Sequence, residues 1–193
     1  MSARFLRLLL VEIRTHICRL VFSVPGRTGI FIRSMFLGKK ISVDPGCYLL
    51  GVKNIQFGTN VTIGMNCIFS AEAGKILIGN NSAFNSNVCL GADFGEIEIG
   101  NDVLVAMNVV IRAADHKFDQ TPKVLIREQG HKGGKIQIGN DVWIGANTCV
   151  VVGATIGDHC VIGAGSVVVG DIPPNSLAVG SPARVIRSIG LSS

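Results

Sequence analysis

An aliphatic residue recurs at every sixth position from Ile138 to Val168, and glycine follows four of these six anchor residues. A repeat this short cannot bury an apolar face by itself, so its copies must stack on one another. A hexapeptide period of this regularity is typical of a parallel β-helix whose anchors point into the prism. The repeat therefore predicts an all-β fold with a continuous apolar interior.

The repeat also predicts the length of each coil. Earlier anchors form three blocks, at Phe57, Ile63 and Phe69, at Ile78, Phe84 and Leu90, and at Ile99, Val105 and Ile111. Matching anchors lie 21 residues apart, which is three hexapeptides plus a three-residue corner insertion. From Ile99 to Ile138 the spacing is 39 residues, so a long excursion leaves after Ile111 and rejoins near Ile136. We place the β-helix domain at 41–193, its excursion at about 112–135 and a C-terminal tail at about 172–193.

Two further positions of the repeat have characteristic residues. Corners carry residues that tolerate left-handed backbone angles, namely Gly79-Asn80-Asn81, Gly100-Asn101-Asp102, Gly139-Asn140-Asp141 and Gly157-Asp158. The fifth position of each hexapeptide is mostly small or β-branched, as a narrow interior requires. These residues are Val61, Cys67, Ala73, Ser82, Val88, Val103, Val109, Val142, Thr148, Ala154, Cys160 and Ser166.

Composition narrows the classes of partner. The formal net charge of +5 fits an anionic ligand or an ordinary solvated surface. We expect no nucleic-acid partner. The six cysteines include no CxxC pair, so we expect buried, reduced thiols and not disulfides.

Residues 1–40 follow a different pattern, apolar but punctuated by Arg4, Arg7, Arg14 and Arg19. The longest unbroken apolar run, Leu8 to Val11, is too short to span a membrane, and no small-residue cleavage site follows. We predict an amphipathic helical segment and keep two interpretations. It caps the β-helix or packs on a neighbouring subunit, or residues 1–24 lie on an anionic membrane surface.

Only two of the four histidines, His116 and His131, fall in the excursion. We expect His16, in the N-terminal segment, and His159, at a corner, to be solvated. A rigid scaffold that presents His116 at the root of a loop suits general-base catalysis, and a structural role stays open on these grounds. Carboxylates that could hold its imidazole are Asp115, Asp119 and Glu128.

Several motifs resemble the hexapeptide-repeat acyltransferases. They are Ala114-Asp115-His116-Lys117-Phe118, Ile126-Arg127-Glu128-Gln129-Gly130, the segment 138–146, Asp171-Ile172-Pro173-Pro174-Asn175 and Gly180-Ser181-Pro182-Ala183-Arg184. The resemblance covers residues 41–188 and is strongest to galactoside, maltose and surface-polysaccharide O-acetyltransferases. It implies a left-handed β-helix, a homotrimer, and acetyl-CoA bound in clefts between subunits.

The resemblance also implies roles for single residues. The catalytic histidine falls on His116, whose neutral imidazole takes the proton of a sugar hydroxyl that attacks the thioester. Asn85 and Glu128 match acceptor-side positions, and a simple corner ladder is the alternative for Asn85. The expected cofactor-binding residues are Trp143, Ala146, Ala164, Arg184 and Arg187. Relatives often carry Thr-Lys where this chain has Val169-Gly170, so we expect the two arginines to hold the CoA nucleotide.

Two other classes of protein share features of this sequence. A γ-type carbonic anhydrase shares the fold but needs three zinc histidines, and His116 and His131 have no third partner in frame, so we expect no metal. A non-catalytic binding module usually lacks the loop histidine. Among acyltransferases, we favour O-acetylation of a surface-polysaccharide precursor in the cytoplasm over N-acetylation of an amino sugar. The sequence does not name the acceptor.

Overall fold

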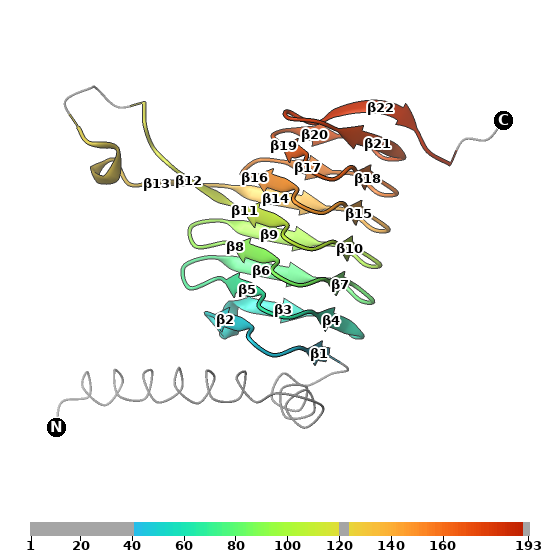
Figure 1. The fold of residues 1–193 in the computed structure, drawn as a ribbon. Coiled ribbons are helices and arrows are strands. Elements are labelled where there is room, and N and C mark those ends of the chain that lie inside the picture. The colour runs from blue at the N-terminus through green and yellow to red at the C-terminus, as the bar shows by residue number, and fades with distance from the viewer. Residues whose placement is uncertain (1–40, 120–123, 191–193) are drawn as a thin grey trace.

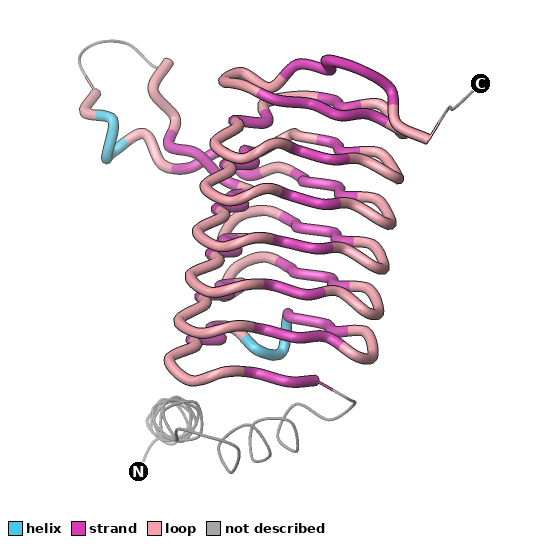
Figure 2. Tube along the Cα trace, turned by 45° about the vertical axis from the view of Figure 1, so that its right-hand side comes forward, coloured by secondary structure: helices cyan, strands magenta, loops and turns pink. Residues whose placement is uncertain are grey.

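The computed structural model describes residues 41–119 and 124–190, which form a parallel β-helix of short stacked strands (Figures 1 and 2). Each coil gives one strand to each of three sheets, named here A, B and C in the order in which the chain visits them. The corners of the prism are accordingly A/B, B/C and C/A. The predicted all-β parallel fold is confirmed.

The three sheets have the following strands. Sheet A contains β1 (Ile41–Val43), β4 (Val61–Ile63), β7 (Ala83–Phe84), β10 (Leu104–Val105), β15 (Trp143–Ile144), β18 (Val161–Ile162), β21 (Ser176–Val179) and the antiparallel β22 (Arg184–Ser188). Sheet B contains β2 (Tyr48–Leu50), β5 (Ile68–Ser70), β8 (Cys89–Gly91), β11 (Val110–Arg112), β16 (Cys149–Val151) and β19 (Val167–Val168). Sheet C contains β3 (Ile55–Phe57), β6 (Lys75–Ile78), β9 (Glu96–Ile99), β14 (Lys135–Ile138), β17 (Thr155–Ile156) and β20 (Asp171–Ile172). Outside the sheets lie the 3-10 turns η1 (Val52–Asn54) and η2 (Ile126–Glu128) and the antiparallel pair β12 (Ala114–His116) and β13 (His131–Gly133).

The strand register matches the predicted coil lengths. In sheet C, Phe57 pairs with Ile78, Ile78 with Ile99, and Ile99 with Ile138. Ile138 then pairs with Ile156, 18 residues later. The 39-residue step is therefore one coil plus an excursion, as the anchor spacing predicts.

The interior is filled by each anchor and by the residue two positions before it, because side chains of a strand alternate between its faces. Ile76 and Ile78, for example, are both buried in β6. The expectation that Ala73 points inward is wrong, since Ala73 is exposed. It lies in the extra residues of the B/C corner, and Ile76 takes the inner place.

The corners use asparagine, aspartate and glycine for two different reasons. Asn81, Asp102 and Asp141 adopt φ angles of 57°, 59° and 53°, so the left-handed conformation expected at corners is confirmed there. The preceding glycines are needed for space. A Cβ on Gly100 would stand 2.6 Å from the carbonyl oxygen of Gly139 in the next coil.

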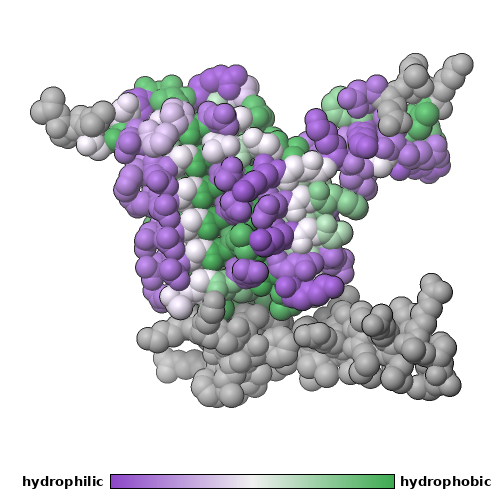
Figure 3. Space-filling model, turned by 180° about the vertical axis from the view of Figure 1, so that it is seen from behind, coloured by the Kyte–Doolittle hydropathy of each residue, from purple (hydrophilic) through white to green (hydrophobic). Residues whose placement is uncertain are grey.

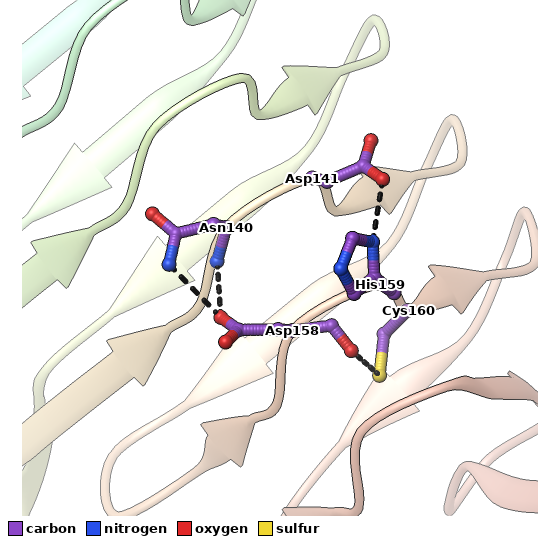
Figure 4. A network of polar contacts seen from close by, with 5 residues as sticks. All are labelled: Asn140, Asp141, Asp158, His159 and Cys160. Atoms are coloured by element: carbon purple, nitrogen blue, oxygen red, sulfur yellow. Dashed lines mark hydrogen bonds and ion pairs between the residues drawn. The ribbon is translucent and has the colours of Figure 1, made fainter.

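Side-chain hydrogen bonds run between coils along the C/A corner (Figure 4). The backbone N–H and the side-chain amide of Asn140 both donate to Oδ1 of Asp158, at 2.6 and 3.1 Å. His159 Nδ1 lies 2.7 Å from Oδ2 of Asp141. His159 is exposed, as predicted, and its φ of 54° makes it the left-handed residue of its corner.

The outer faces of sheets B and C differ in chemistry. Sheet C is charged, with ion pairs between Lys75 and Glu96 (3.6 Å) and between Lys135 and Glu98 (2.8 Å). The outward residues that follow the anchors of sheet B are mixed and include Arg112. The outward residues that precede the anchors pair from coil to coil and are aromatic, aliphatic or thiol side chains: Tyr48, Ile68, Cys89, Val110, Cys149 and Val167. We call this set the sheet B column. Figure 3 shows a band of hydrophobic side chains that crosses successive coils between hydrophilic columns.

The excursion projects sideways from the prism as the β12–β13 ribbon, with η2 beyond it (Figure 1). The predictions for residues 1–40, including an amphipathic helix and membrane contact through 1–24, fall outside the described residues. Within 41–119 and 124–190, no helix has the length and hydropathy needed to cross a bilayer.

Candidate active site

His116 stands where the chain leaves the prism. β11 ends at Arg112, and the N–H of Ala113 still donates to Gly91 of the coil below at 2.9 Å. The returning strand is tied at the same place, because the N–H of Gly134 donates to the carbonyl of Ala113 at 3.0 Å. His116 ends β12, three residues beyond this anchor, with an exposed side chain. Its backbone is thus fixed by the β-helix while its imidazole faces solvent.

The ring of His116 contacts the ring of His131, the other histidine of the excursion. The two residues pair directly across the ribbon, and their ring centroids lie 4.3 Å apart. His131 also stacks on Phe94, with centroids 4.5 Å apart and 8° between the ring planes. The sequence did not predict the contacts with His131 and Phe94. The two strands of the ribbon are joined by a long loop without repeats, so their register cannot be read from the sequence.

No described carboxylate holds the His116 imidazole. Asp115, Asp119 and Glu128 are exposed, and none has a hydrogen bond to His116 within the described residues. Glu128 instead lies in η2 with Oε1 3.8 Å from Nη2 of Arg127. The orientation of the ring by a carboxylate stays a prediction, and the described contact of the His116 ring is with His131.

Asn85 lies at the A/B corner, immediately after β7. Residues at the equivalent position in the coils on either side are Gly64 and Ala106, so Asn85 brings an amide into a column of small residues. Its Oδ1 accepts a hydrogen bond from the Ser86 N–H at 2.7 Å. The corner ladder runs beside it, through Asn87, Asn108 and Asn147. The neighbouring asparagines therefore form the corner ladder, and within the described residues the hydrogen bonds of this ladder do not include Asn85.

The same A/B corner carries small residues in the later coils. Ala146 is half-buried and Ala164 is exposed, and the two stack in successive coils because the N–H of Gly165 donates to the carbonyl of Ala146 at 2.8 Å. A Cβ on Gly165 would meet no atom within 4 Å. The corner is an open shelf on which a slender chain, such as a pantetheine arm, can lie close to the backbone.

Trp143 lies on the outer face of sheet A, paired with Leu104 and Val161. It lines a shallow hollow of about 150 Å³ whose other side is formed by Asp141 and His159 at the C/A corner. Trp143 is 54% exposed, which leaves its ring available for contact. The structure thus places it on the sheet beside the shelf, with its hollow on the far side from Ala146.

Arg184 and Arg187 lie on β22, the antiparallel strand at the end of sheet A, and both are exposed. The Arg184 guanidinium donates to the carbonyl of Ala183 at 2.9 Å, and that of Arg187 donates to Ser188 at 3.2 Å. Neither has an ion-pair partner in the described part of the chain. Both retain free donors that suit phosphate.

Five of the candidate residues lie at two different corners of one chain, whereas Trp143, Arg184 and Arg187 lie on sheet A. His116 and Glu128 belong to the excursion at the B/C corner, and Asn85, Ala146 and Ala164 lie at the A/B corner. The strands of sheet B separate these two corners. A single copy of the chain therefore brings His116 and the shelf to different edges.

Metal-ligating residues do not gather at either corner. Across 41–119 and 124–190, no group of three or more His, Cys, Asp or Glu side chains is arranged to hold a metal ion. The two histidines of the excursion face each other ring to ring. Cys67, Cys89, Cys149 and Cys160 carry free thiols.

Comparison with known sequences places the repeat in a recognised family. Residues 135–170 match the family model described as bacterial transferase hexapeptide (six repeats). The chain is 40% identical over 161 residues to galactoside O-acetyltransferase of Escherichia coli, covering 82% of this chain and 66% of that protein. Matches to staphylococcal proteins described as putative acetyltransferases are shorter, and span about a third of those relatives' length.

Solved structures extend the likeness to nearly the whole chain. A maltose O-acetyltransferase from Clostridium difficile is 34% identical with a TM-score of 0.62, over 94% of this chain and 88% of that one. An N-acyltransferase from Bacillus cereus, solved with dTDP and 3-hydroxybutyryl-CoA, is 25% identical with a TM-score of 0.70, over 79% and 81% of the two chains. The expected left-handed β-helix of hexapeptide repeats is confirmed by these likenesses.

Proposed function

Since the chain belongs to the bacterial hexapeptide-repeat acyltransferases, we propose that it is an O-acetyltransferase that moves the acetyl group of acetyl-CoA to a sugar hydroxyl. The observation that carries this proposal is the place of His116, exposed at the root of the excursion and tied to the prism by β12 and β13. The likeness to galactoside and maltose O-acetyltransferases supports a sugar as acceptor.

His116 acts as general base in the proposed reaction. Its neutral imidazole accepts the proton of the acceptor hydroxyl while that oxygen forms a bond to the carbonyl carbon of the thioester. The carbon–sulfur bond then breaks, and the departing CoA sulfur takes the proton from the imidazolium. The products are the acetyl ester and CoA with a free thiol. No acyl-enzyme is required.

The complete site forms between subunits of a homotrimer. In a cyclic trimer each interface joins two different surfaces of the chain, so the B/C corner of one subunit can meet the A/B corner of its neighbour. The sheet B column supports an interface here, because monomers seldom expose a continuous row of apolar side chains; Tyr48, Ile68 and Val110 are 50%, 40% and 37% exposed. His116 then stands beside the shelf of Ala146 and Ala164.

The donor lies on that shelf. Ala146 and Ala164 admit the pantetheine arm, Trp143 borders the shelf on sheet A, and the guanidinium groups of Arg184 and Arg187 contact the nucleotide phosphates. Asn85, in the same corner column, hydrogen-bonds the acceptor, and Glu128 contacts it from the excursion.

The acceptor class we favour is a precursor of a surface polysaccharide, modified in the cytoplasm. Residues 1–24 hold the enzyme at the inner face of the membrane in this proposal, because arginines punctuate an apolar segment there. An amino-sugar acceptor is the second candidate, and the likeness to an N-acyltransferase solved with dTDP favours it.

The test is release of CoA thiol from acetyl-CoA, measured against a panel of mono-, oligo- and lipid-linked saccharides and one nucleotide-linked amino sugar. Burial raises the pKa of the Cys89 and Cys149 thiols, so these side chains stay protonated at neutral pH. They therefore react slowly in the thiol assay and add little to the signal from free CoA. Turnover with a hydroxyl acceptor supports the proposal. Turnover confined to amino sugars, or none with any saccharide, contradicts it.

A further inference from the structure

The imidazole of His116 contacts that of His131 with 40° between the ring planes, and His131 in turn stacks on Phe94. We infer that His131, seated on Phe94, is a positioning residue that holds the His116 imidazole in place for proton transfer. This inference rests on the function proposed above. It assigns a role to a histidine and a phenylalanine that the sequence did not connect with the reaction.

The ribbon register brings the two imidazoles together. Hydrogen bonds from Lys117 N–H to the Gly130 carbonyl and from Gly134 N–H to the Ala113 carbonyl, both 3.0 Å, mark alternate pairs along the ribbon. The pair of His116 and His131 lies one step from the first of these pairs and three steps from the second, so it is a non-hydrogen-bonded pair. Side chains come closest at such pairs. Two residues 15 positions apart are thus placed face to face by the backbone.

The ribbon rests on the coil below it, which ties the stack to the prism. Gly133 lies on the same side of β13 as His131, and a Cβ there would overlap the backbone carbonyl of Phe94. Ala114, on the same side of β12 as His116, is only 3% exposed. The side of the ribbon that carries both imidazoles therefore faces the B/C corner, where Phe94 lies.

Phe94 is an unusual residue for its place. Its φ is 141°, a region that L side chains seldom adopt, and its side chain is 51% exposed. Twenty-one residues earlier, the same corner carries Ala73. Neither local conformation nor burial accounts for a phenylalanine here, and its ring contact with His131 does.

A fixed imidazole matters for a general base. His116 is exposed and has no described hydrogen bond to hold its side chain, so without a neighbour its ring would populate several rotamers. A misplacement of about 1 Å can reduce a rate up to about 100-fold. Contact with His131 restricts the ring while leaving its other face open to the acceptor.

The test compares two substitutions of His131 with an acceptor that the wild-type enzyme uses. His131→Ala removes the ring, and we expect kcat to fall about 10- to 100-fold while the KM for acetyl-CoA stays within about two-fold. His131→Phe keeps a ring but no nitrogen, and we expect kcat within about three-fold of wild type. Phe94→Leu should resemble His131→Ala. His159→Ala, an exposed histidine at the C/A corner, is the control and should leave kcat unchanged.

The possible outcomes separate this inference from the proposed function. Unchanged kcat in His131→Ala overturns the inference, and so do equal losses in His131→Ala and His131→Phe. If His116→Ala abolishes turnover and His131→Ala does not, the inference is contradicted and the proposed function is not. If the wild-type enzyme has no turnover, the proposed function is contradicted. Proton NMR gives a measurement that does not depend on activity. Phe94→Leu removes the ring current that shields the His131 protons, so their signals should move downfield. Signals that do not move would exclude stacking of His131 on Phe94.

Discussion

At the scale of single residues, Asn85 has a side chain that its column does not require. Gly64 and Ala106 occupy the equivalent places in the adjacent coils, and the ladder bonds that stabilise this corner pass through other asparagines. The Nδ2 group of Asn85 has no hydrogen-bond partner among the described residues. An exposed amide at the edge of the proposed site is therefore available to an acceptor.

Asn85→Ala should raise the KM for the acceptor by roughly 3- to 10-fold, the equivalent of one hydrogen bond, and leave the melting temperature unchanged. Steady-state kinetics with varied acceptor measure the first and thermal unfolding the second. Asn108→Ala is the matched control: it breaks the ladder at a residue with a φ of 60°, so it should lower the melting temperature and spare the acceptor KM. The reverse pattern would return Asn85 to a structural role.

Arg184 lies on β22 with most of its donors unused. Arg184→Ala should raise the KM for acetyl-CoA roughly 10- to 100-fold, because a charge-assisted contact to phosphate is lost, with little change in acceptor KM. Initial rates over a range of acetyl-CoA concentrations measure this effect. Lys75→Ala removes a cation from sheet C and should change neither constant. A shift confined to the acceptor KM would show that Arg184 lies on the other side of the site.

At the scale of elements, the corners are held close by glycine. In coil after coil the glycine that follows an anchor sits against the backbone of the next corner, as Gly79 does against Gly100 and Gly100 against Gly139. At the C/A corner, successive coils therefore lie too close together for a Cβ atom at the position of these glycines. This contact explains why the sequence repeats glycine there even though these glycines lack the left-handed φ.

Gly100→Ala should destabilise the protein by about 1–3 kcal/mol, the usual cost of forcing extra atoms into a packed region. Differential scanning calorimetry should show a lower melting temperature. Gly170→Ala is the matched control, because a Cβ there meets no atom within 4 Å and its φ is not left-handed. If the two variants melted together, close stacking would not be the reason for glycine at the corner.

At the scale of the whole molecule, the sheet B column distinguishes the outer face of sheet B from that of sheet C. Sheet C meets water with paired charges, and the column presents apolar and thiol side chains between the two candidate corners. A face of this kind is expected at an interface. Its burial against a neighbouring copy would join the B/C and A/B corners.

Val110→Asp should therefore dissociate the assembly, because an unpaired carboxylate would be buried at the centre of the column. Light scattering should give about three times the chain mass of 20.4 kDa for the wild type and about one chain mass for the variant. Thr155→Asp, on the outward face of sheet C, should keep the wild-type mass. A wild type that is itself monomeric would contradict the shared site.

The sequence predicted the fold in more detail than the site. Anchor spacing is a property of the chain, so the register of Phe57, Ile78, Ile99 and Ile138 followed from it. The exposed position of Ala73 could not be predicted in this way, because the six-residue period is interrupted by the corner insertion in which Ala73 lies. The contact of His116 with His131 depends on the pairing of two strands joined by a non-repeating loop, and no local pattern encodes that register. Contacts between subunits likewise cannot be predicted from the repeat pattern of one chain.

The most direct test of the account is complementation between two inactive variants. His116→Ala lacks the base, and Ala164→Trp blocks the shelf at an exposed position that the fold tolerates. Each alone should lack activity, whereas co-expressed chains should recover about a quarter of wild-type turnover, since one in four interfaces of a random trimer joins an intact histidine to an intact shelf. Mixed assemblies that stay inactive would contradict a site shared between subunits.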